Sequence, residues 1–316
     1  MTGQLLASAS TSAGHTDRLL LAMLLLCGGM AVVLATLVVF FSVRYRAGAR
    51  ADRSAPPSNA RGLEAAWTVL PLLLFIGVFA WAARDYVQQR NPPAGALPIY
   101  VIGKQWMWKL QHRDGRREIN ELHVPLGQPV RLVMTSEDAI HSLFIPAFRL
   151  KQDVVPGRYT QLWFTATQAG EFQVFCSEFC GSEHSAMIGH VVVLPAEGYR
   201  RWLAEAPPAP GLAERGARLF AEQGCAGCHG AASTVHAPPL EGLLGRTVHL
   251  QDGRSLVADE TYVRDAILLP ARDVVAGQAP SMPSYAGRLD EEQIQALIAW
   301  MRSTAAAPAA GNRTTP

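Results

Sequence analysis

Two long uncharged apolar segments near the N-terminus constrain the fold of this 316-residue chain more than any other feature. The first, residues 19–43, has 25 residues, enough to cross a bilayer core of about 30 Å. The second, residues 67–83, has 17 residues and lies at the short end of the spanning range. We therefore expect residues 1–95 to form a transmembrane hairpin.

The charges around these segments predict how the hairpin is oriented. The loop between them carries five arginines against Asp52 and Glu64, whereas only Asp17 and Arg18 precede the first segment. Basic loops stay in the cytoplasm, so both termini are expected outside it. A cleaved signal peptide is disfavoured because a basic leader is missing and the apolar run is too long. Cys27, inside the first span, is interpreted as a lipid-facing or packed thiol.

The exported part of the chain changes character twice. Residues 96–197 contain short β-branched and aromatic runs separated by turn formers, a pattern typical of an antiparallel sandwich or barrel. A Pro/Ala-rich linker is expected at 198–211, followed by helices in a domain at 212–303 and a disordered tail at 304–316. Asp290 and Gln293 form a capping-box pattern ahead of the last helix, whose apolar face comprises Ile294, Leu297, Ile298 and Met301.

The sequence "CAGCH" marks the helical domain as a site for covalently attached haem. Cys225 and Cys228 have the spacing that adds to two haem vinyl groups, and His229 then faces the iron. A second axial ligand is expected downstream. Met282 is favoured because "APSMPSY" presents it from a proline-fixed segment, over the alternatives His236, His249 and Met301.

A second cluster, "CSEFCGSEHSAM", suggests a metal site in the β domain. It combines Cys176, Cys180, His184 and Met187, with His141 lying 35 residues upstream. Thiolate, imidazole and thioether ligands together favour copper, while methionine is a poor zinc ligand. A disulfide between the two cysteines remains the main alternative, because the compartment is oxidising. It would leave the other three side chains unexplained.

The helical domain resembles a class I cytochrome c, which implies an all-α fold, in more than its haem motif. "GARLF" is similar to the family's first helix, in which Gly216 lets the last helix approach, and "APPLEGLLGR" to its haem-binding loop. The resemblance implies that the Pro238 carbonyl accepts a hydrogen bond from the proximal histidine and that Arg246 meets a haem propionate. Ala237 stands where the family usually has glycine.

The hairpin and β domain closely resemble subunit II of haem–copper cytochrome c oxidases, whose all-β cupredoxin-like Greek-key sandwich holds the dinuclear CuA centre. The resemblance implies that the side chains of the second cluster bind two copper ions, together with the Glu178 carbonyl. It also implies a magnesium ion shared with subunit I through the Glu178 carboxylate. Trp106 in "KQWMW" would be the electron entry point, and Glu64 in "LEAAWTVLP" would lie at the mouth of the K-pathway for proton uptake.

Together these resemblances predict a multidomain membrane protein that carries electrons in a bacterial inner-membrane oxidase. Electrons would enter from a soluble cytochrome c or other small redox protein at the haem, pass to the copper and reach haem in subunit I, where O2 reduction is coupled to proton translocation. Subunit III is a further expected partner. The net charge of +2 gives no indication of nucleic-acid binding. The alternatives are a membrane-anchored carrier for another reductase and a thiol–disulfide protein with an attached cytochrome.

The two exported domains are expected to be tethered without one fixed arrangement. The 16 residues between Pro195 and Leu212 give a high local concentration of one domain around the other but do not impose one relative orientation. The cytochrome domain has a net charge of −3 and the β domain of −1, too little for strong electrostatic steering.

Overall fold

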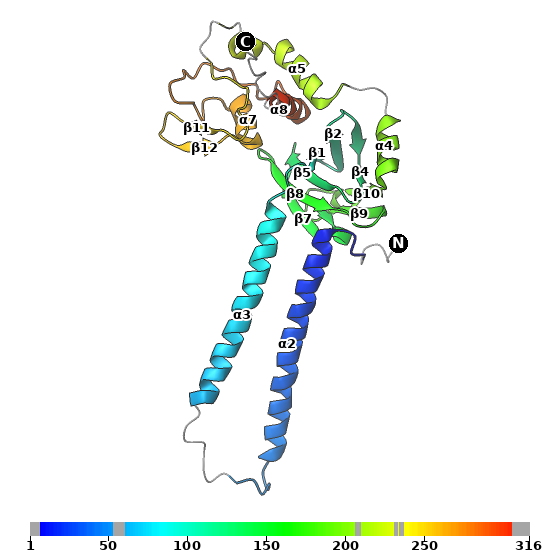
Figure 1. Ribbon diagram of the computed structural model, residues 1–316, viewed down its shortest axis with the longest axis vertical. Coiled ribbons are helices and arrows are strands. Elements are labelled where there is room, and N and C mark those ends of the chain that lie inside the picture. The colour runs from blue at the N-terminus through cyan, green and yellow to red at the C-terminus, as the bar shows by residue number, and fades with distance from the viewer. Residues whose placement is uncertain (1–6, 53–60, 206–209, 231–232, 234–236, 305–316) are drawn as a thin grey trace, which may run out of the picture.

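The computed structural model describes residues 7–52, 61–205, 210–230, 233 and 237–304. Two long helices form a hairpin, a β-sandwich follows at its open end, and a mainly helical domain lies beyond the sandwich (Figure 1). The alternative haem ligand His236 and residues 305–316 of the tail expected at 304–316 lie outside the described residues, and Thr304 is helical rather than part of a tail.

The hairpin consists of α2 (Thr11–Arg44) and α3 (Arg61–Arg90). Both are long and apolar enough to cross a membrane, and they contain the two predicted spans. The Ser10 hydroxyl caps α2 by accepting a hydrogen bond from the Ala13 backbone N–H at 3.0 Å. Beside it, Arg149 of the sandwich pairs with Asp17 at 2.9 Å. The sandwich is thus attached directly to the first helix.

Two five-stranded sheets form the sandwich. One has the order β3-β2-β1-β5-β8 and the other β4-β10-β9-β6-β7. Their strands are β1 (Leu97–Lys104), β2 (Met107–His112), β3 (Arg117–Ile119), β4 (Glu121–Pro125), β5 (Pro129–Ser136), β6 (His141–Ile145), β7 (Leu150–Val154), β8 (Thr160–Thr165), β9 (Gly170–Cys176) and β10 (Ile188–Leu194). Short 3-10 helices occur at η1 (Pro146–Phe148) and η2 (His184–Ala186).

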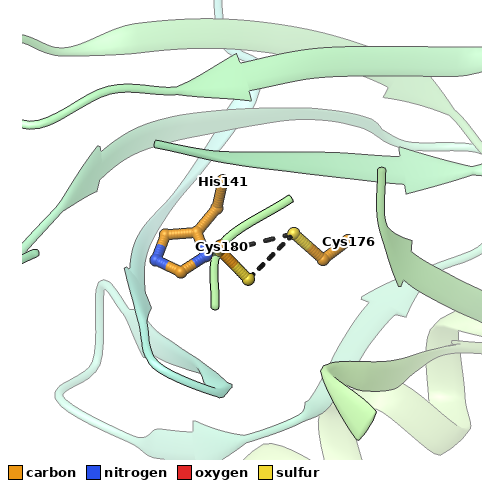
Figure 2. A group of neighbouring side chains, drawn as sticks. All are labelled: His141, Cys176 and Cys180. Atoms are coloured by element: carbon orange, nitrogen blue, oxygen red, sulfur yellow. Dashed lines mark hydrogen bonds between the residues drawn. The ribbon is translucent and has the colours of Figure 1, made fainter. Parts of the chain in front are cut away.

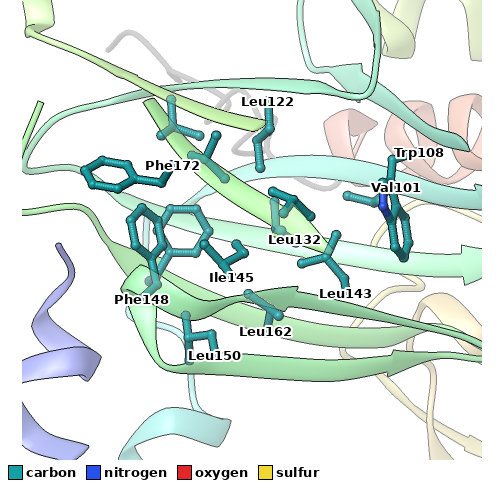
Figure 3. Packing of buried hydrophobic residues seen from close by; sticks show 14 of the residues in the cluster. Val101, Trp108, Leu122, Leu132, Leu143, Ile145, Phe148, Leu150, Leu162 and Phe172 are labelled. Carbon is teal, nitrogen blue, oxygen red and sulfur yellow. The ribbon is translucent and has the colours of Figure 1, made fainter. Parts of the chain in front are cut away.

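The core lies between the inner faces of these sheets, as the period-two pattern predicts. Figure 3 shows Phe148, Phe172 and Ile145 packed together at one end and Trp108 near Leu143 at the other. The expectation of purely antiparallel pairing is wrong at two places. Strand β1 pairs parallel with β5, and β10 pairs parallel with β4. Alternation of apolar residues reports which face is buried but not the direction of the neighbouring strand.

The first part of the expected linker is helical. Helix α4 (Ala196–Ala204) follows β10 directly and buries Tyr199. Its Trp202 indole stacks on His123, with ring centroids 4.5 Å apart. The proline- and alanine-rich composition pointed to a linker, whereas aromatic packing against the sandwich keeps this segment in place. The expectation of a linker over all of 198–211 is therefore wrong for its first residues.

The C-terminal domain contains α5 (Leu212–Glu222), α6 (Ala226–His229), α7 (Glu260–Leu268) and α8 (Glu291–Thr304). The predicted capping box is confirmed. Gln293 N–H donates to the Asp290 carboxylate at 2.8 Å, and the Gln293 side chain accepts from the Asp290 N–H at 3.0 Å. The expectation of an all-α domain needs correction, because β11 (Thr247–His249) and β12 (Ser255–Val257) form a small antiparallel hairpin.

Helices α5 and α8 cross at Gly216, as the resemblance to cytochromes c implies. A Cβ atom at this position would lie 2.0 Å from the Ala296 carbonyl oxygen and 2.7 Å from the Trp300 Cβ. The Trp300 ring packs on Phe220 with centroids 4.3 Å apart. Only glycine allows the two backbones to approach so closely.

The helical domain docks on the outer face of the sheet that contains β1 and β5. Leu212 and Ala296 are fully buried against Tyr100 and Val133. Charged groups surround this apolar contact, and each pair joins one side chain from either domain: Arg131–Glu260 at 3.1 Å and Arg117–Glu292 at 2.9 Å. The expectation that the linker leaves the domain without a fixed position is therefore not met in this structure.

Candidate copper and haem sites

The side chains of the predicted copper site converge from three parts of the second sheet. His141 begins β6, Cys176 ends β9, and the loop from Cys180 through η2 to Met187 leads into β10. His141, Cys176, Cys180 and Met187 are buried. The structure thus brings together residues that lie 46 positions apart in the chain.

The distances between the donor atoms suit a shared metal centre. The sulfur atoms of Cys176 and Cys180 are 3.8 Å apart, and Figure 2 shows both facing the His141 ring. The His141 Nδ1 lies 3.9 Å from the Cys176 sulfur, and the His184 Nδ1 lies 3.5 Å from the Cys180 sulfur. The Met187 sulfur completes the group at 3.8 Å from Cys180. Each histidine is therefore adjacent to a different cysteine.

Both cysteines are free thiols rather than a disulfide. A disulfide holds its sulfur atoms about 2.05 Å apart, much closer than in this site. A metal–thiolate bond of about 2.3 Å instead allows both sulfur atoms to bind the same ion in their present positions. The donor set therefore fits copper, which prefers thiolate, imidazole and thioether ligands.

The two thiols differ in acidity because they share one buried site. Burial alone would raise the pKa of Cys176, but hydrogen bonds with His141 and with backbone groups lower it to about 6. Burial, together with the negative charge of Cys176, raises the pKa of Cys180 to about 12. One positive ion would relieve this conflict by stabilising both thiolates at once.

Glu178 lies between the two cysteines with its carbonyl oxygen 3.2 Å from the Cys176 sulfur, on the side expected for a backbone ligand. Its carboxylate is exposed, as is the neighbouring Phe179 ring, which is 77% exposed. Glu64 lies far along the chain, exposed in the first turn of α3. The structure therefore does not bring Glu64 to either cofactor site.

Trp106 lies against the copper-site loop. A Cβ atom at Gly181 would come within 3.2 Å of the Trp106 indole ring, so the glycine permits this contact. Trp108 is buried in the core, and its ring also meets the His141 ring edge-on, with centroids 5.9 Å apart. Both aromatic residues of "KQWMW" thus border the donor cluster.

Two polar residues that support the site were not singled out from the sequence. Asp138 accepts a hydrogen bond from His141 Nε2 at 2.8 Å and so directs Nδ1 towards Cys176. The Gln105 side chain donates to the Cys180 carbonyl oxygen at 2.7 Å. The position of Asp138 three residues before His141 was the available signal, but a carboxylate in a loop is too common to point to a supporting role.

The predicted haem ligands line a large crevice in the helical domain, with about 1480 Å³ of empty space, part of it continuous with solvent. Cys225, Cys228 and His229 line it together with Met282, which lies on an irregular segment. Its lining is mainly apolar and includes Phe220, Leu240, Val263, Ile267 and Leu297. An apolar crevice with a histidine and a methionine on its walls suits an electron-transfer haem.

The contacts implied for the haem loop are present in part. The Pro238 carbonyl oxygen lies 3.0 Å from His229 Nδ1, which directs Nε2 into the crevice. Arg246 lines the crevice and donates to the Pro239 carbonyl at 3.2 Å. Met301 is buried in the last helix, and His249 bonds the Ser255 hydroxyl at 2.8 Å. Met301 also lines the crevice, from α8, so the choice of Met282 as the sixth ligand stays a prediction.

Comparisons with known proteins agree with this division into two sites. Residues 116–194 match the family model described as "Cytochrome C oxidase subunit II, periplasmic domain", and residues 213–305 match the model described as "Cytochrome c". Cytochrome c oxidase subunit 2 of Alkalihalophilus pseudofirmus is 28% identical over 86% of this chain and 82% of its own length.

Two further relatives match part of the chain. Alternative cytochrome c oxidase subunit 2 of Bradyrhizobium diazoefficiens is 31% identical over 46% of this chain and 65% of its own length. The crystal structure of the periplasmic domain of subunit II of cytochrome oxidase (CoxB) of Bradyrhizobium japonicum is 30% identical, covers 37% of this chain and 96% of that chain, and has a TM-score of 0.36.

Proposed function

Because the chain belongs to the cytochrome c oxidase subunit II family and carries a C-terminal cytochrome c domain, we propose that it forms an internal electron path within a terminal oxidase. Electrons enter at a covalently bound haem c, pass to a dinuclear copper centre and continue to haem in subunit I. There O2 is reduced to water with coupled proton translocation. The chain transfers electrons and does not itself hold the oxygen site.

The convergence of both thiols with two histidines and a methionine carries this proposal. His141, Cys176, Cys180, His184 and Met187 bind the two copper ions through side chains, and Glu178 through its carbonyl oxygen. The two thiolates would hold both copper ions, which would supply a one-electron redox centre. In the helical domain, Cys225 and Cys228 hold the haem covalently, His229 and Met282 bind its iron, and Arg246 meets a propionate.

The chain's own residues set the conditions for transfer. Asp138 orients His141 at the copper site, and the Pro238 carbonyl orients His229 at the haem site. Trp106, packed against the Gly181 backbone, is the entry point for electrons at the copper site. Because the two domains are docked, the haem site stays near the copper site. This supports electron transfer between the two sites of one molecule over transfer to copper directly from a separate donor protein.

The remaining assignments concern the membrane and the partners. The hairpin anchors the chain in the bacterial inner membrane with both termini and both cofactor domains on the periplasmic side. Subunit I and subunit III are the expected partners, and a soluble cytochrome c or other small redox protein is the donor. The exposed Glu178 carboxylate is available for a magnesium ion shared with subunit I, and Glu64 for the entrance of the K-pathway.

Pre-steady-state reduction of the intact oxidase tests the order of the path. Freeze-quench spectra after mixing with a reduced donor should show haem c reduced before copper. Met282→Ala should lower the haem potential, and each 59 mV of that shift makes haem reduction about tenfold less favourable. Copper reduction should then slow while the copper spectrum stays unchanged. Copper reduced at the wild-type rate in this variant would contradict entry through the haem.

Ionic strength gives a second test of the internal path. Because the haem domain is tethered and docked, the haem-to-copper step should change little between low and high salt. A steep decrease of this step with salt would indicate that transfer depends on electrostatic encounter between separate partners.

A further inference from the structure

Apart from the candidate copper site, the sandwich carries another cluster of histidine and glutamate side chains, residue types that commonly bind metals. It comprises His112 at the end of β2, Glu118 on β3, and Glu121 and His123 on β4. None of these residues is a proposed ligand of copper or haem. The Glu118 side chain is only 7% exposed, and its two carboxylate oxygens contact different histidines. One oxygen lies 2.6 Å from His112 Nε2, and the other contacts His123 Nδ1.

Three groups of this cluster lie close enough together to share one ion. The ligand atoms of Glu118, Glu121 and His123 all lie within 4.8 Å of one another. Glu121 and His123 are two residues apart on β4, so their side chains project from the same face of the strand. Asn120, with a positive φ of 59°, makes the step between β3 and β4 that brings Glu118 beside them. The backbone therefore fixes all three positions.

The surroundings hold two of these groups in place. The Tyr199 hydroxyl lies 3.5 Å from His112 Nδ1, which leaves His112 Nε2 to donate to Glu118. The Trp202 ring of α4 stacks on His123 at 4.5 Å, and the Arg116 guanidinium lies 3.7 Å from the centre of the same ring. Glu121 is exposed and leaves a route from solvent.

We propose that Glu118, Glu121 and His123 bind one zinc-class divalent cation, and that His112 is the positioning residue that orients Glu118. Imidazole nitrogen with carboxylate oxygen suits Zn²⁺, whereas Ca²⁺ and Mg²⁺ prefer oxygen ligands alone. Three protein ligands leave a fourth position for water. A histidine that donates to a ligating carboxylate is a common supporting contact in such sites.

Binding exchanges a hydrogen bond for two metal bonds. The ion enters between the Glu118 oxygen and His123 Nδ1, and the proton on Nδ1 is exchanged through solvent to Nε2, so that His123 binds as a neutral imidazole. Because Trp202 stacks on His123, the occupied site also fixes the surface under α4, the helix that precedes the cytochrome domain. This site is independent of the electron path, so the two proposals can fail separately.

Zinc binding to the full-length chain tests the site. The protein, loaded with copper and haem and purified in detergent, is dialysed to equilibrium against Zn²⁺ alone, and zinc, copper and haem are counted. We expect one zinc per haem with no loss of copper. Glu121→Gln should weaken this binding by at least about tenfold, and His112→Gln by a similar factor. Equal zinc affinity of Glu121→Gln and the wild-type chain would overturn the proposal.

The choice of Glu121 separates a metal site from a purely structural cluster. This side chain is exposed, so its replacement leaves the buried contacts of Glu118 intact and should not unfold the domain. Glu171→Gln is the matched control, because Glu171 pairs with His190 at 3.6 Å on neighbouring strands. Its zinc affinity should equal that of the wild type. In the wild type, but not in Glu121→Gln, zinc should slow amide hydrogen exchange in α4, and slowing of equal size in both would also overturn the proposal.

Discussion

The two cofactor sites of this chain are prepared in opposite ways. The copper donors are mostly buried, and each of them already lies within 4 Å of at least one other donor. The haem ligands line a wide crevice, and Cys228 is exposed. A β-sandwich packs its hydrophobic core without the metal, so it can hold the ligands of a small ion in place before the ion binds. A haem is large enough to form part of a domain's core, so we expect the helical domain to gain packing when its cofactor is bound.

Replacing one copper ligand should have the largest effect and should remain confined to the sandwich. Cys176→Ser removes a thiolate that both ions need, so we expect complete loss of the dinuclear copper signal in electron paramagnetic resonance spectra. Haem content should stay at one per chain. Cys27→Ser, in the first membrane helix, is the control and should retain both cofactors. A dinuclear signal that survives Cys176→Ser would refute the assigned ligands.

Gly216→Ala should affect the helical domain alone. The added Cβ would overlap the Ala296 carbonyl, and rigid backbone cannot yield cheaply, so we expect destabilisation of about 1–3 kcal/mol. Thermal unfolding monitored at the haem absorbance measures the change. Gly198→Ala in α4 is the matched control, because its nearest neighbours lie at an ordinary 3.8 Å. Equal stability of Gly216→Ala and wild type would show that the helices can separate without cost.

Much of this contrast could be predicted from the sequence. Both domains could be predicted from the period-two runs and the capping box. The two cysteine motifs predicted which side chains belong to each cofactor site. Local patterns succeed at such places because burial and capping are decided within a few residues.

The features that were missed depend on distant contacts. Helix α4 is held by the stacking of Trp202 on His123, which lies 79 positions earlier in the sequence. The parallel strand pairs, the β11–β12 hairpin and the support of His141 by Asp138 likewise have no distinctive local signature. The docking of the domains was missed because nearly balanced net charges conceal the opposite charges that meet at the interface.

Weakening that interface should have a moderate effect on both domains. The Glu260 carboxylate, 11% exposed, joins Arg131 of the sandwich and Arg302 of α8. Glu260→Gln should cost about 1 kcal/mol of docking energy, equivalent to about fivefold faster hydrogen exchange at interface amides such as that of Leu212. Glu214→Gln, which removes an exposed pair with Arg218 within α5, should leave this exchange unchanged. Unchanged exchange in Glu260→Gln would mean that apolar contact alone holds the domains together.

The smallest predicted effect is a pH dependence confined to the helical domain. Burial would raise the pKa of Asp273, but hydrogen bonds from Arg272 and Arg254 lower it. A carboxyl group with a lowered pKa stabilises the fold above its usual pKa and loses this contribution as pH falls below that value. Asp273→Asn should therefore lose less melting temperature than wild type between pH 7 and pH 3. Parallel losses in the two proteins would show that these arginine contacts are not formed in solution.

Counting copper in the full-length, haem-loaded chain tests the central claim most directly. The account predicts two copper ions per haem and an electron paramagnetic resonance spectrum of one unpaired electron shared over both ions. One copper ion or none per haem would contradict it, and a disulfide between Cys176 and Cys180 would again become the leading interpretation of the cluster.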